Sequence, residues 1–301
     1  MKRMLLSVLA VVATVGIVFL GFAYWYDTTG QHPDARYDTR VAQPAYVQTH
    51  PVVLVDATHN NFHTCAGRYQ PFCVLLRSDG LEVKDLRQWS AAGLAGSSVL
   101  VIANAAGPDG YEEKNAFSDE DQQAIVGYVN GGGSLFLIAD HSPFGSAAQE
   151  LAGRFRVTMH YRYARDDDNK DGWDNERLLF SRANGLLRSH PITEGRTPEE
   201  RVERVVTFTG QSLSGPPGST AILVMGEKAY DWESRKVRFP AAGHAQVIAF
   251  EYGKGRVVVA GEAAFLTAQV DPLGLKFGMN SAGNDDRKFL LNALHWLTHT
   301  I

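Results

Sequence analysis

Cysteine is scarce in this chain, with only Cys65 and Cys73 among its 301 residues. Neither stands at a recognisable turn from a strand into a helix, so a thiolate nucleophile is not expected. In an exported protein the two side chains could pair as a disulfide, whereas otherwise they are two buried thiols on one short segment. The sequence leaves both alternatives open.

Long basic runs are also missing, and the formal net charge is −4. Nucleic-acid binding depends on clustered Lys and Arg that neutralise phosphates, so we expect no nucleic-acid partner. No internal repeat and no low-complexity tract occurs. With 45% hydrophobic and 21% charged residues, the chain has an ordinary globular balance and ample material for a core.

Charge is absent from Met4–Tyr26, an apolar stretch long enough to cross a bilayer. Lys2 and Arg3 precede it, and such residues stay on the cytoplasmic side. We therefore expect residues 1–26 to be an uncleaved transmembrane signal anchor. It would make a single pass through the inner (cytoplasmic) membrane and leave the C-terminal domain on the periplasmic or extracellular side. A cleaved signal peptide is the alternative, but its apolar core is usually only about 7–15 residues long.

Residues 27–50 are polar, contain prolines and lack apolar periodicity, which indicates a linker between membrane and domain. From residue 51 onward, short apolar runs alternate with helical segments. The clearest run, Leu135–Ala139, lies between three glycines and a proline turn, as expected of a strand buried on both faces. The other predicted strands are Val52–Val55, Leu81–Val83, Val99–Ala103, Val205–Phe208, Ala221–Met225, and the hairpin of Val247–Glu251 with Arg256–Ala260.

Helices are predicted over Gly67–Ser78, from Ser118 with a capping box to Asp121, from about Gly145, and over Asp285–His299. This alternation predicts an α/β domain over residues 51–301, with a doubly wound, mostly parallel sheet. Residues from about 154 to 200 show little periodicity, and we expect them to form an insertion or lid.

An acidic stretch within this insertion partly matches a calcium-binding loop. The match includes Asp167, Asn169, Asp171 and Gly172, but Leu178 stands where an EF-hand loop has glutamate. A solvated acidic loop is the more typical interpretation of such a partial match.

Polar side chains gather directly after several predicted strands. Parallel strands present their carboxyl ends at one edge of a sheet, so residues far apart in sequence can line one pocket there. A turn or helix cap is the alternative role for any single one of them. The expected catalytic residues are His59, Asp140, His141 and Glu262. The expected ligand-binding residues are Asp56, Asn60, Asn61, His63, Asn104, Ser142 and Asn284.

The chemistry of this pocket stays open. His59, His63, Asp140 and His141 are suitable zinc ligands, although H-x-x-x-H indicates a metal specifically only in a helix with a glutamate. Ser142 lacks the glycines of a nucleophile elbow. A general acid or base role for Asp140 or Glu262 would need a shifted pKa. The sequence identifies no cofactor and leaves the metal content unknown.

Six segments carry a resemblance to a known family: VVLVDATHNNFH, GGGSLFLIADHSPFGSAAQELAGRF, SHPITEGR, ERVVTFTGQS, VVVAGEAAF and GNDDRKFLLNALHWL. Through them, residues 51–301 resemble the class I glutamine amidotransferase-like superfamily, and within it an uncharacterised group of bacterial membrane-anchored proteins. The resemblance implies a flavodoxin-like fold. Amidotransferases proper hold a cysteine at the elbow after the central strand, whereas this chain has Asp140 between Ala139 and His141. This departure argues against glutamine hydrolysis by a thiolate.

Two functional hypotheses follow. The first is an exported, membrane-anchored domain that binds an unknown small-molecule or protein ligand, or acts as a scaffold, without a thiol nucleophile. The second is a hydrolase that uses the pocket of His and carboxylate side chains, with or without a metal. The missing elbow cysteine favours the first hypothesis, and the density of titratable groups favours the second.

Overall fold

A nine-stranded sheet forms the centre of the molecule. The computed structural model describes residues 15–16, 19–22, 30–110, 114–172, 176–234 and 237–301. The strands of the central sheet are β2 (Val52–Asp56), β3 (Glu82–Leu86), β4 (Val99–Ala103), β5 (Ser134–Ile138), β6 (Thr158–Met159), β10 (Leu213–Ser214), β11 (Thr220–Val224), β14 (Ala245–Tyr252) and β15 (Gly255–Ala260). Their order is β3-β2-β4-β5-β15-β14-β10-β6, and β11 pairs with β14 outside this path.

The sheet is mixed. Strands β3, β2, β4, β5 and β15 run parallel to one another. The β14–β15 hairpin then reverses the direction, and β14, β11, β10 and β6 pair antiparallel. The predicted hairpin and the parallel half are thus confirmed, and the antiparallel extension makes the sheet less uniform than predicted.

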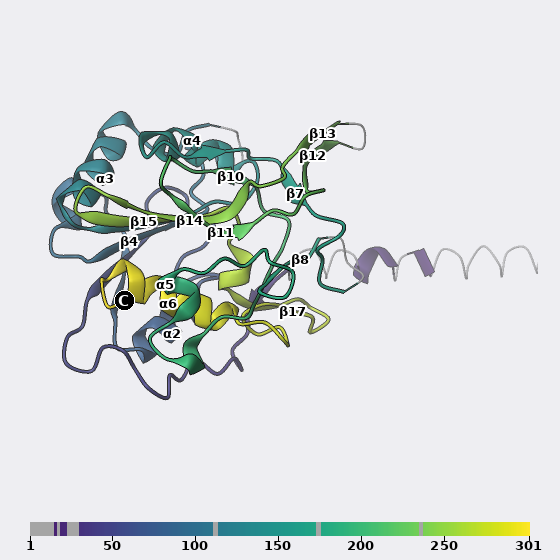
Figure 1. Cartoon of the computed structure of the whole chain (residues 1–301), viewed down its shortest axis with the longest axis horizontal. Coiled ribbons are helices and arrows are strands. Elements are labelled where there is room, and N and C mark those ends of the chain that lie inside the picture. The colour runs from purple at the N-terminus through teal and green to yellow at the C-terminus, as the bar shows by residue number, and fades with distance from the viewer. Residues whose placement is uncertain (1–14, 17–18, 23–29, 111–113, 173–175, 235–236) are drawn as a thin grey trace, which may run out of the picture.

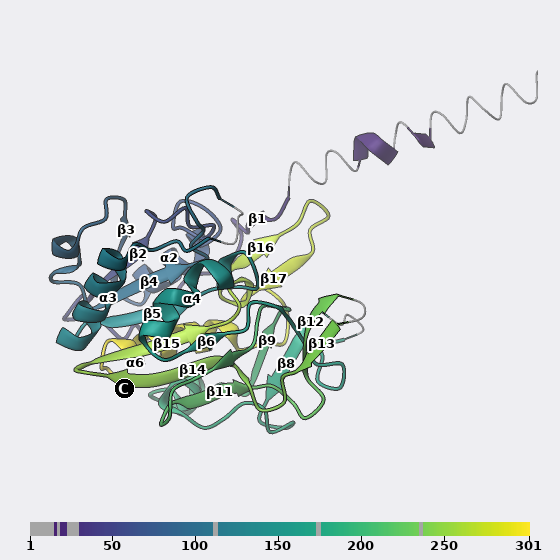
Figure 2. The same cartoon turned by 90° about the horizontal axis from the view of Figure 1, so that it is seen from above.

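Helices cover both faces of the sheet (Figures 1 and 2). Those on one face are α3 (Asp119–Gly131) and α4 (Phe144–Arg154), and those on the other are α2 (Gln70–Ser78), α6 (Asp286–Leu297) and the short α5 (Pro191–Glu194). Short 3-10 helices occur at η1 (Ala91–Leu94), η2 (Pro198–Glu200) and η3 (Ala264–Leu266). The capping box predicted for Ser118 and Asp121 is present at the start of α3.

The strands divide the apolar residues between two cores. Along β5, Phe136 and Ile138 belong to the core that includes residues of α2 and α6. Leu135 and Leu137 belong to the core that includes residues of α3 and α4. All four side chains are fully buried, because successive strand residues point to opposite faces and both faces are covered.

Three smaller sheets surround the carboxyl edge of the parallel strands. Their strands are β1 (His32–Pro33), β16 (Ala268–Val270) and β17 (Lys276–Gly278) in one, β7 (Tyr163–Arg165), β12 (Tyr230–Ser234) and β13 (Val237–Pro240) in the second, and β8 (Leu178–Ser181) and β9 (Arg204–Thr207) in the third. The region from about 154 to 200, predicted to be an insertion or lid, contains regular strands. It supplies β6, β7 and β8, and each of these pairs with a strand from beyond residue 200.

The predicted linker also has a different structure from the one expected. Within residues 30–50, β1 pairs with β16, and the side chain of Tyr46 is buried. The backbone N–H of Ala45 donates to Asp79 Oδ1 at 2.8 Å. Residues 30–50 therefore contact the domain through β1, Ala45 and Tyr46.

The predicted anchor, Met4–Tyr26, falls largely outside the described residues. Of this stretch, residues 15–16 and 19–22 are described, as helix. Across the described part of the chain, no helix has both the length and the apolar character that a membrane span requires.

Candidate functional site

Asn104 and Asp140 link the ends of the neighbouring strands β4 and β5. The Nδ2 atom of Asn104 donates to Asp140 Oδ2 at 2.6 Å, and the backbone N–H of Asp140 donates to Asn104 Oδ1 at 2.9 Å. Asn104 is fully buried and has φ of 46°, a left-handed conformation that asparagine tolerates. Asp140 Oδ1 accepts from the backbone N–H of Ala263 at 2.7 Å, which adds the end of β15.

Glu262 is the second carboxyl group at this edge. It is buried, and its two oxygens accept the N–H groups of Ala264 at 2.6 Å and Phe265 at 2.8 Å, at the start of η3. Burial, together with the negative charge of Asp140, raises the pKa of Glu262 to about 8, although these N–H groups act in the opposite direction. Burial also raises the pKa of Asp140, against the effects of Asn104 and His141. The two carboxyl groups are therefore close enough to oppose ionisation of both at once.

Tyr69 and His63 lie beside these carboxyl groups on the α2 side of the sheet. The Tyr69 hydroxyl is buried and donates to the carbonyl oxygen of Ala263 at 3.1 Å, and its ring centroid is 4.8 Å from that of His63. Burial and the charge of Arg68 lower the pKa of His63 to about 3, so this ring is neutral at physiological pH. Tyr69 was absent from the predicted site because it precedes a helix, where no sequence pattern marks it.

His59 points in a different direction. Its Nδ1 atom is 2.8 Å from Asp56 Oδ2, and both side chains are buried. Its ring packs against Trp89 and Phe117, with centroid distances of 4.8 and 4.6 Å. Phe117 belongs to the core on the α3 side, whereas His63 contacts Tyr69 in the core on the α2 side.

The structure therefore gives the predicted histidines different partners: His59 pairs with Asp56, whereas His63 contacts Tyr69. Asp56 ends β2, and Asn104, Asp140 and Glu262 follow β4, β5 and β15, so all four lie at one edge of the parallel strands. His59 contacts Asp56 and Phe117, and no hydrogen bond or ion pair joins it to Asp140 in the described part of the chain.

The asparagines after β2 hold turns. Asn60 has φ of 49° and donates through Nδ2 to the carbonyl oxygen of Gly107 at 3.1 Å. Asn61 Oδ1 accepts from the backbone N–H of His59 at 3.0 Å, and its Nδ2 donates to the carbonyl oxygen of Ala103 at 3.4 Å. Their polar atoms join the loops after β2 and β4.

Three further predicted residues lie at or near this edge. His141 is partly exposed, and its Nδ1 is 2.8 Å from the carbonyl oxygen of Ser142. The centroid of its ring is 3.9 Å from the centroid of the Tyr163 ring. Ser142 is also partly exposed, and its hydroxyl is 3.2 Å from that of Ser146. Asn284 instead lies two residues before α6, where its Oδ1 accepts from the backbone N–H of Asp286 at 3.2 Å.

The two cysteines form a disulfide, which decides between the two alternatives left open by the sequence. Cys65 precedes α2 and Cys73 lies within it. No free cysteine occurs in the described part of the chain.

The acidic stretch does not adopt the arrangement of a calcium loop. Asp171 pairs with Arg177 at 2.9 Å and with Arg204. Asp168 pairs with Lys228 at 2.8 Å, and Asp167 accepts from the Tyr230 hydroxyl at 3.2 Å. These carboxylates have partners from the protein itself, so the loop is held by ion pairs rather than simply solvated.

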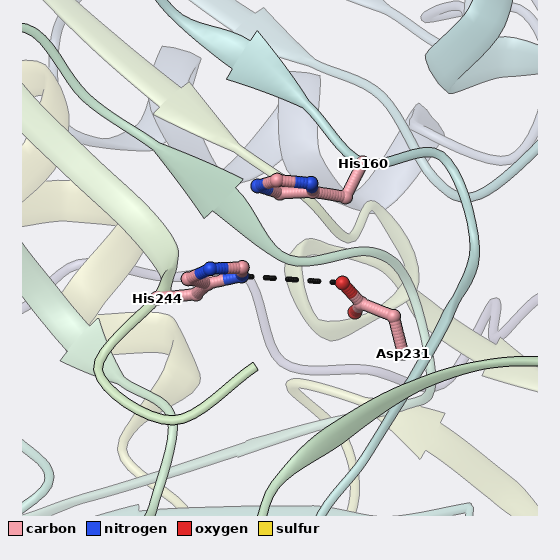
Figure 3. Close-up of side chains that lie close together, drawn as sticks. All are labelled: His160, Asp231 and His244. Atoms are coloured by element: carbon pink, nitrogen blue, oxygen red, sulfur yellow. Dashed lines mark ion pairs between the residues drawn. The ribbon is translucent and has the colours of Figure 1, made fainter. Parts of the chain in front are cut away.

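A second polar cluster, formed by His160, Asp231 and His244, was not predicted (Figure 3). The two imidazole rings are nearly parallel, with centroids 4.4 Å apart, and His244 Nδ1 is 3.9 Å from Asp231 Oδ2. One ligand atom from each residue lies within 4.8 Å of the others, so these three residues could hold a metal ion. Burial and the charges of His244 and Arg162 lower the pKa of His160 to about 4.

No sequence signal marked this cluster because none of its members follows a predicted parallel strand. His160 follows β6, His244 precedes β14, and Asp231 lies within β12 of a separate sheet. Antiparallel pairing through β10 brings the first two together, and β12, which pairs with β7, places Asp231 beside them.

Comparison with protein-family models and with curated proteins gives no match. Among solved structures, the N-terminal domain of mmIFT52 is similar, with a TM-score of 0.60 and 16% identity over 82% of this chain and 97% of that chain. A putative ThuA-like protein from Bacteroides uniformis has a TM-score of 0.47 and 11% identity, over 88% of this chain and 95% of that chain. The beta-galactosidase from Rahnella sp. R3 has a TM-score of 0.43 and 10% identity, over 83% of this chain and 31% of that chain. Of these three structures, the mmIFT52 domain has a TM-score above 0.5, and at 16% identity this similarity concerns the fold alone.

Proposed function

We propose that this chain is a membrane-anchored ligand-binding domain with a class I glutamine amidotransferase-like fold and no thiolate nucleophile. The observation that carries the proposal is the hydrogen bonding of the Asp140 side chain. Asp140 stands at the position where amidotransferases proper have cysteine. Its two carboxyl oxygens accept from Asn104 and from the backbone N–H of Ala263. A carboxylate held in this way fixes the strand ends relative to one another, and the only two cysteines of the chain form a disulfide.

The ligand surface would begin directly after Asp140. His141 and Ser142 are partly exposed there, and the His141 ring lies against Tyr163. Open α/β sheets bind their ligands beyond the carboxyl ends of the parallel strands. An imidazole, a hydroxyl and an aromatic ring at this position suit a small polar ligand.

Anchoring in the membrane is supported by three observations. The described helical residues Val15, Phe19 and Leu20 are apolar and highly exposed. Disulfides persist in oxidising compartments, which fits a domain outside the cytoplasm. Leu273 and Leu275 are also exposed, on the turn between β16 and β17, the sheet that β1 joins.

The test combines a glutaminase assay with a thermal-shift screen of the full-length chain. We expect no ammonia release from glutamine above the blank. We also expect stabilisation by at least one class in a panel of amino acids, sugars, sugar phosphates and short peptides. The stabilisation should be lost in His141→Ala and kept in His50→Ala, whose imidazole lies away from this edge. Glutamine turnover, or the absence of any stabilising class, would contradict the proposal.

One observation favours a second function, hydrolysis by acid–base catalysis. Asp140 and Glu262 have raised pKa values, and such carboxyl pairs act as general acids and bases in many enzymes. Hydrolysis of an ester or glycoside substrate that disappears in a folded Asp140→Asn variant would favour this alternative. Retention of that activity in the variant would exclude it.

A further inference from the structure

We propose that His160, Asp231 and His244 form a binding site for a divalent transition-metal ion of the zinc class (Figure 3). Two imidazole nitrogens and one carboxylate are a ligand set used for zinc and for other first-row divalent ions. The site is distinct from the edge formed by Asp140 and Glu262, and it is independent of the proposed ligand-binding function.

The carboxylate provides the strongest argument. Asp231 is only 1% exposed, and its Oδ1 atom has no hydrogen-bond partner among the described residues. Its Oδ2 atom accepts from the Ser212 hydroxyl at 2.8 Å. A buried carboxylate oxygen without a partner is costly, and a bound cation would compensate for the lost hydration.

The imidazoles lie close enough to complete the ligand set. Zinc bonds of about 2.0–2.1 Å in tetrahedral geometry place ligand atoms roughly 3.4 Å apart. The three ligand atoms here lie within 4.8 Å of one another. Binding would therefore bring them together by at most about 1.4 Å, a change that rotation of the two histidine side chains can provide.

Hydroxyl groups orient the three ligands. The Ser212 hydroxyl contacts both Asp231 Oδ2 and His244 Nδ1, the latter at 2.9 Å, and the Ser214 hydroxyl is 3.0 Å from His160 Nε2. Second-shell hydrogen bonds of this kind position the ligands in metal sites. Ser212 is fully buried, so it is not presented to a substrate, which argues against a Ser-His-Asp hydrolase at this cluster.

The environment of the cluster indicates an open site. His160 and His244 are partly exposed, so water or a ligand could occupy further coordination positions. The Arg162 guanidinium is nearby and would repel a cation, but it lies 3.6 Å from Glu233, which partly balances its charge. The Arg162 guanidinium carbon also lies 4.2 Å from the centroid of the Phe239 ring, and this contact holds the guanidinium to one side of the cluster.

The test uses the metal-stripped, untagged full-length chain. It is titrated with Zn²⁺ alone in an isothermal titration calorimeter, and elemental analysis then measures the bound zinc. We expect one tightly bound Zn²⁺ per chain. We also expect a Co²⁺ absorption spectrum typical of four- or five-coordinate nitrogen and oxygen ligands. Binding should fall by more than about 100-fold in His244→Ala and Asp231→Asn, and by roughly 10–100-fold in Ser212→Ala.

His50→Ala is the matched control, since His50 is an exposed histidine whose Nδ1 contacts the carbonyl oxygen of Gly80. Circular dichroism checks folding, and Asp231→Asn, which preserves side-chain shape, decides the question if His244→Ala does not fold. Absence of stoichiometric Zn²⁺ binding overturns the proposal, and so does equal binding by the wild type and a folded Asp231→Asn variant. These readouts do not depend on catalysis or on the ligand proposed above.

Discussion

Asp140 and Glu262 show how a local environment separates two chemically similar residues. The Asp140 carboxyl group bonds across the strand ends, whereas the Glu262 carboxyl group binds the N–H groups at the start of η3. The charge of Asp140 contributes to the raised pKa of Glu262. The protonation of one carboxyl group therefore depends on the other.

The pH dependence of stability tests this coupling. The pKa of Glu262 is about 8 in the folded protein, compared with 4.5 ordinarily, so the folded state holds a proton that the unfolded state releases. Its contribution to the free energy of unfolding is complete below about pH 4.5 and is lost as the pH rises through 8. Asp140→Asn removes the repelling charge, so we expect this variant to gain stability relative to the wild type as the pH rises over that range.

Urea unfolding at pH 5, 6.5 and 8 measures this difference. The comparison between variants is needed because the lowered pKa values of His63, His160 and His190 contribute the opposite slope in every variant. Glu120→Gln, at an exposed position of α3, serves as the control and should follow the wild type. Parallel pH profiles for Asp140→Asn and the wild type would refute the coupling.

At the scale of elements, the disulfide fixes the turn before α2. Cys65 and Cys73 are separated by eight positions and are both buried, so the bond holds this turn against the first helix. Tyr69, which contacts the carbonyl oxygen of Ala263, lies between them. The bond thus stabilises an element that packs beside the Asp140 edge.

Removing the disulfide should lower stability without removing function. For a loop of this length, the chain-entropy model gives about 2–3 kcal/mol. We expect the double change Cys65→Ser/Cys73→Ser to lower the free energy of unfolding by about this amount, measured by urea unfolding. Ligand stabilisation should stay within a few-fold of the wild type. Complete loss of binding in a folded double variant would restore a thiol-dependent mechanism.

At the scale of the whole molecule, the packing of residues 30–50 limits how far the domain can lie from a membrane. Because β1 is paired with β16, only about five residues separate position 26 from the domain, and they span at most about 17 Å. If residues 1–26 cross the membrane, the β1-β16-β17 sheet must lie close to it.

Cell fractionation tests this arrangement. We expect the full-length chain in the membrane fraction with Met1 retained, and a variant lacking residues 1–26 in the soluble fraction. We expect membrane association because the uncharged stretch Met4–Tyr26 follows Lys2 and Arg3. N-terminal sequencing provides the readout, and a mature soluble chain that begins near residue 27 would refute the anchor.

The sequence by itself determined the elements whose signals are local. Apolar runs of strand length predicted β2, β4, β5 and β15, and the Ser118–Asp121 pattern predicted the start of α3. The position of Asp56, Asn104, Asp140 and Glu262 directly after these strands was also predictable, because the carboxyl ends of parallel strands meet at one edge.

Tertiary structure alone decided where the side chains at that edge point and what else lies near them. His59 and His63 are only four positions apart, yet His59 contacts Phe117 of one core and His63 contacts Tyr69 of the other. Residues 154–200 lacked periodicity because their strands are short and pair with distant segments. The same long-range antiparallel pairing assembles His160, Asp231 and His244, and no local pattern encodes a contact that depends on three separate strand pairings.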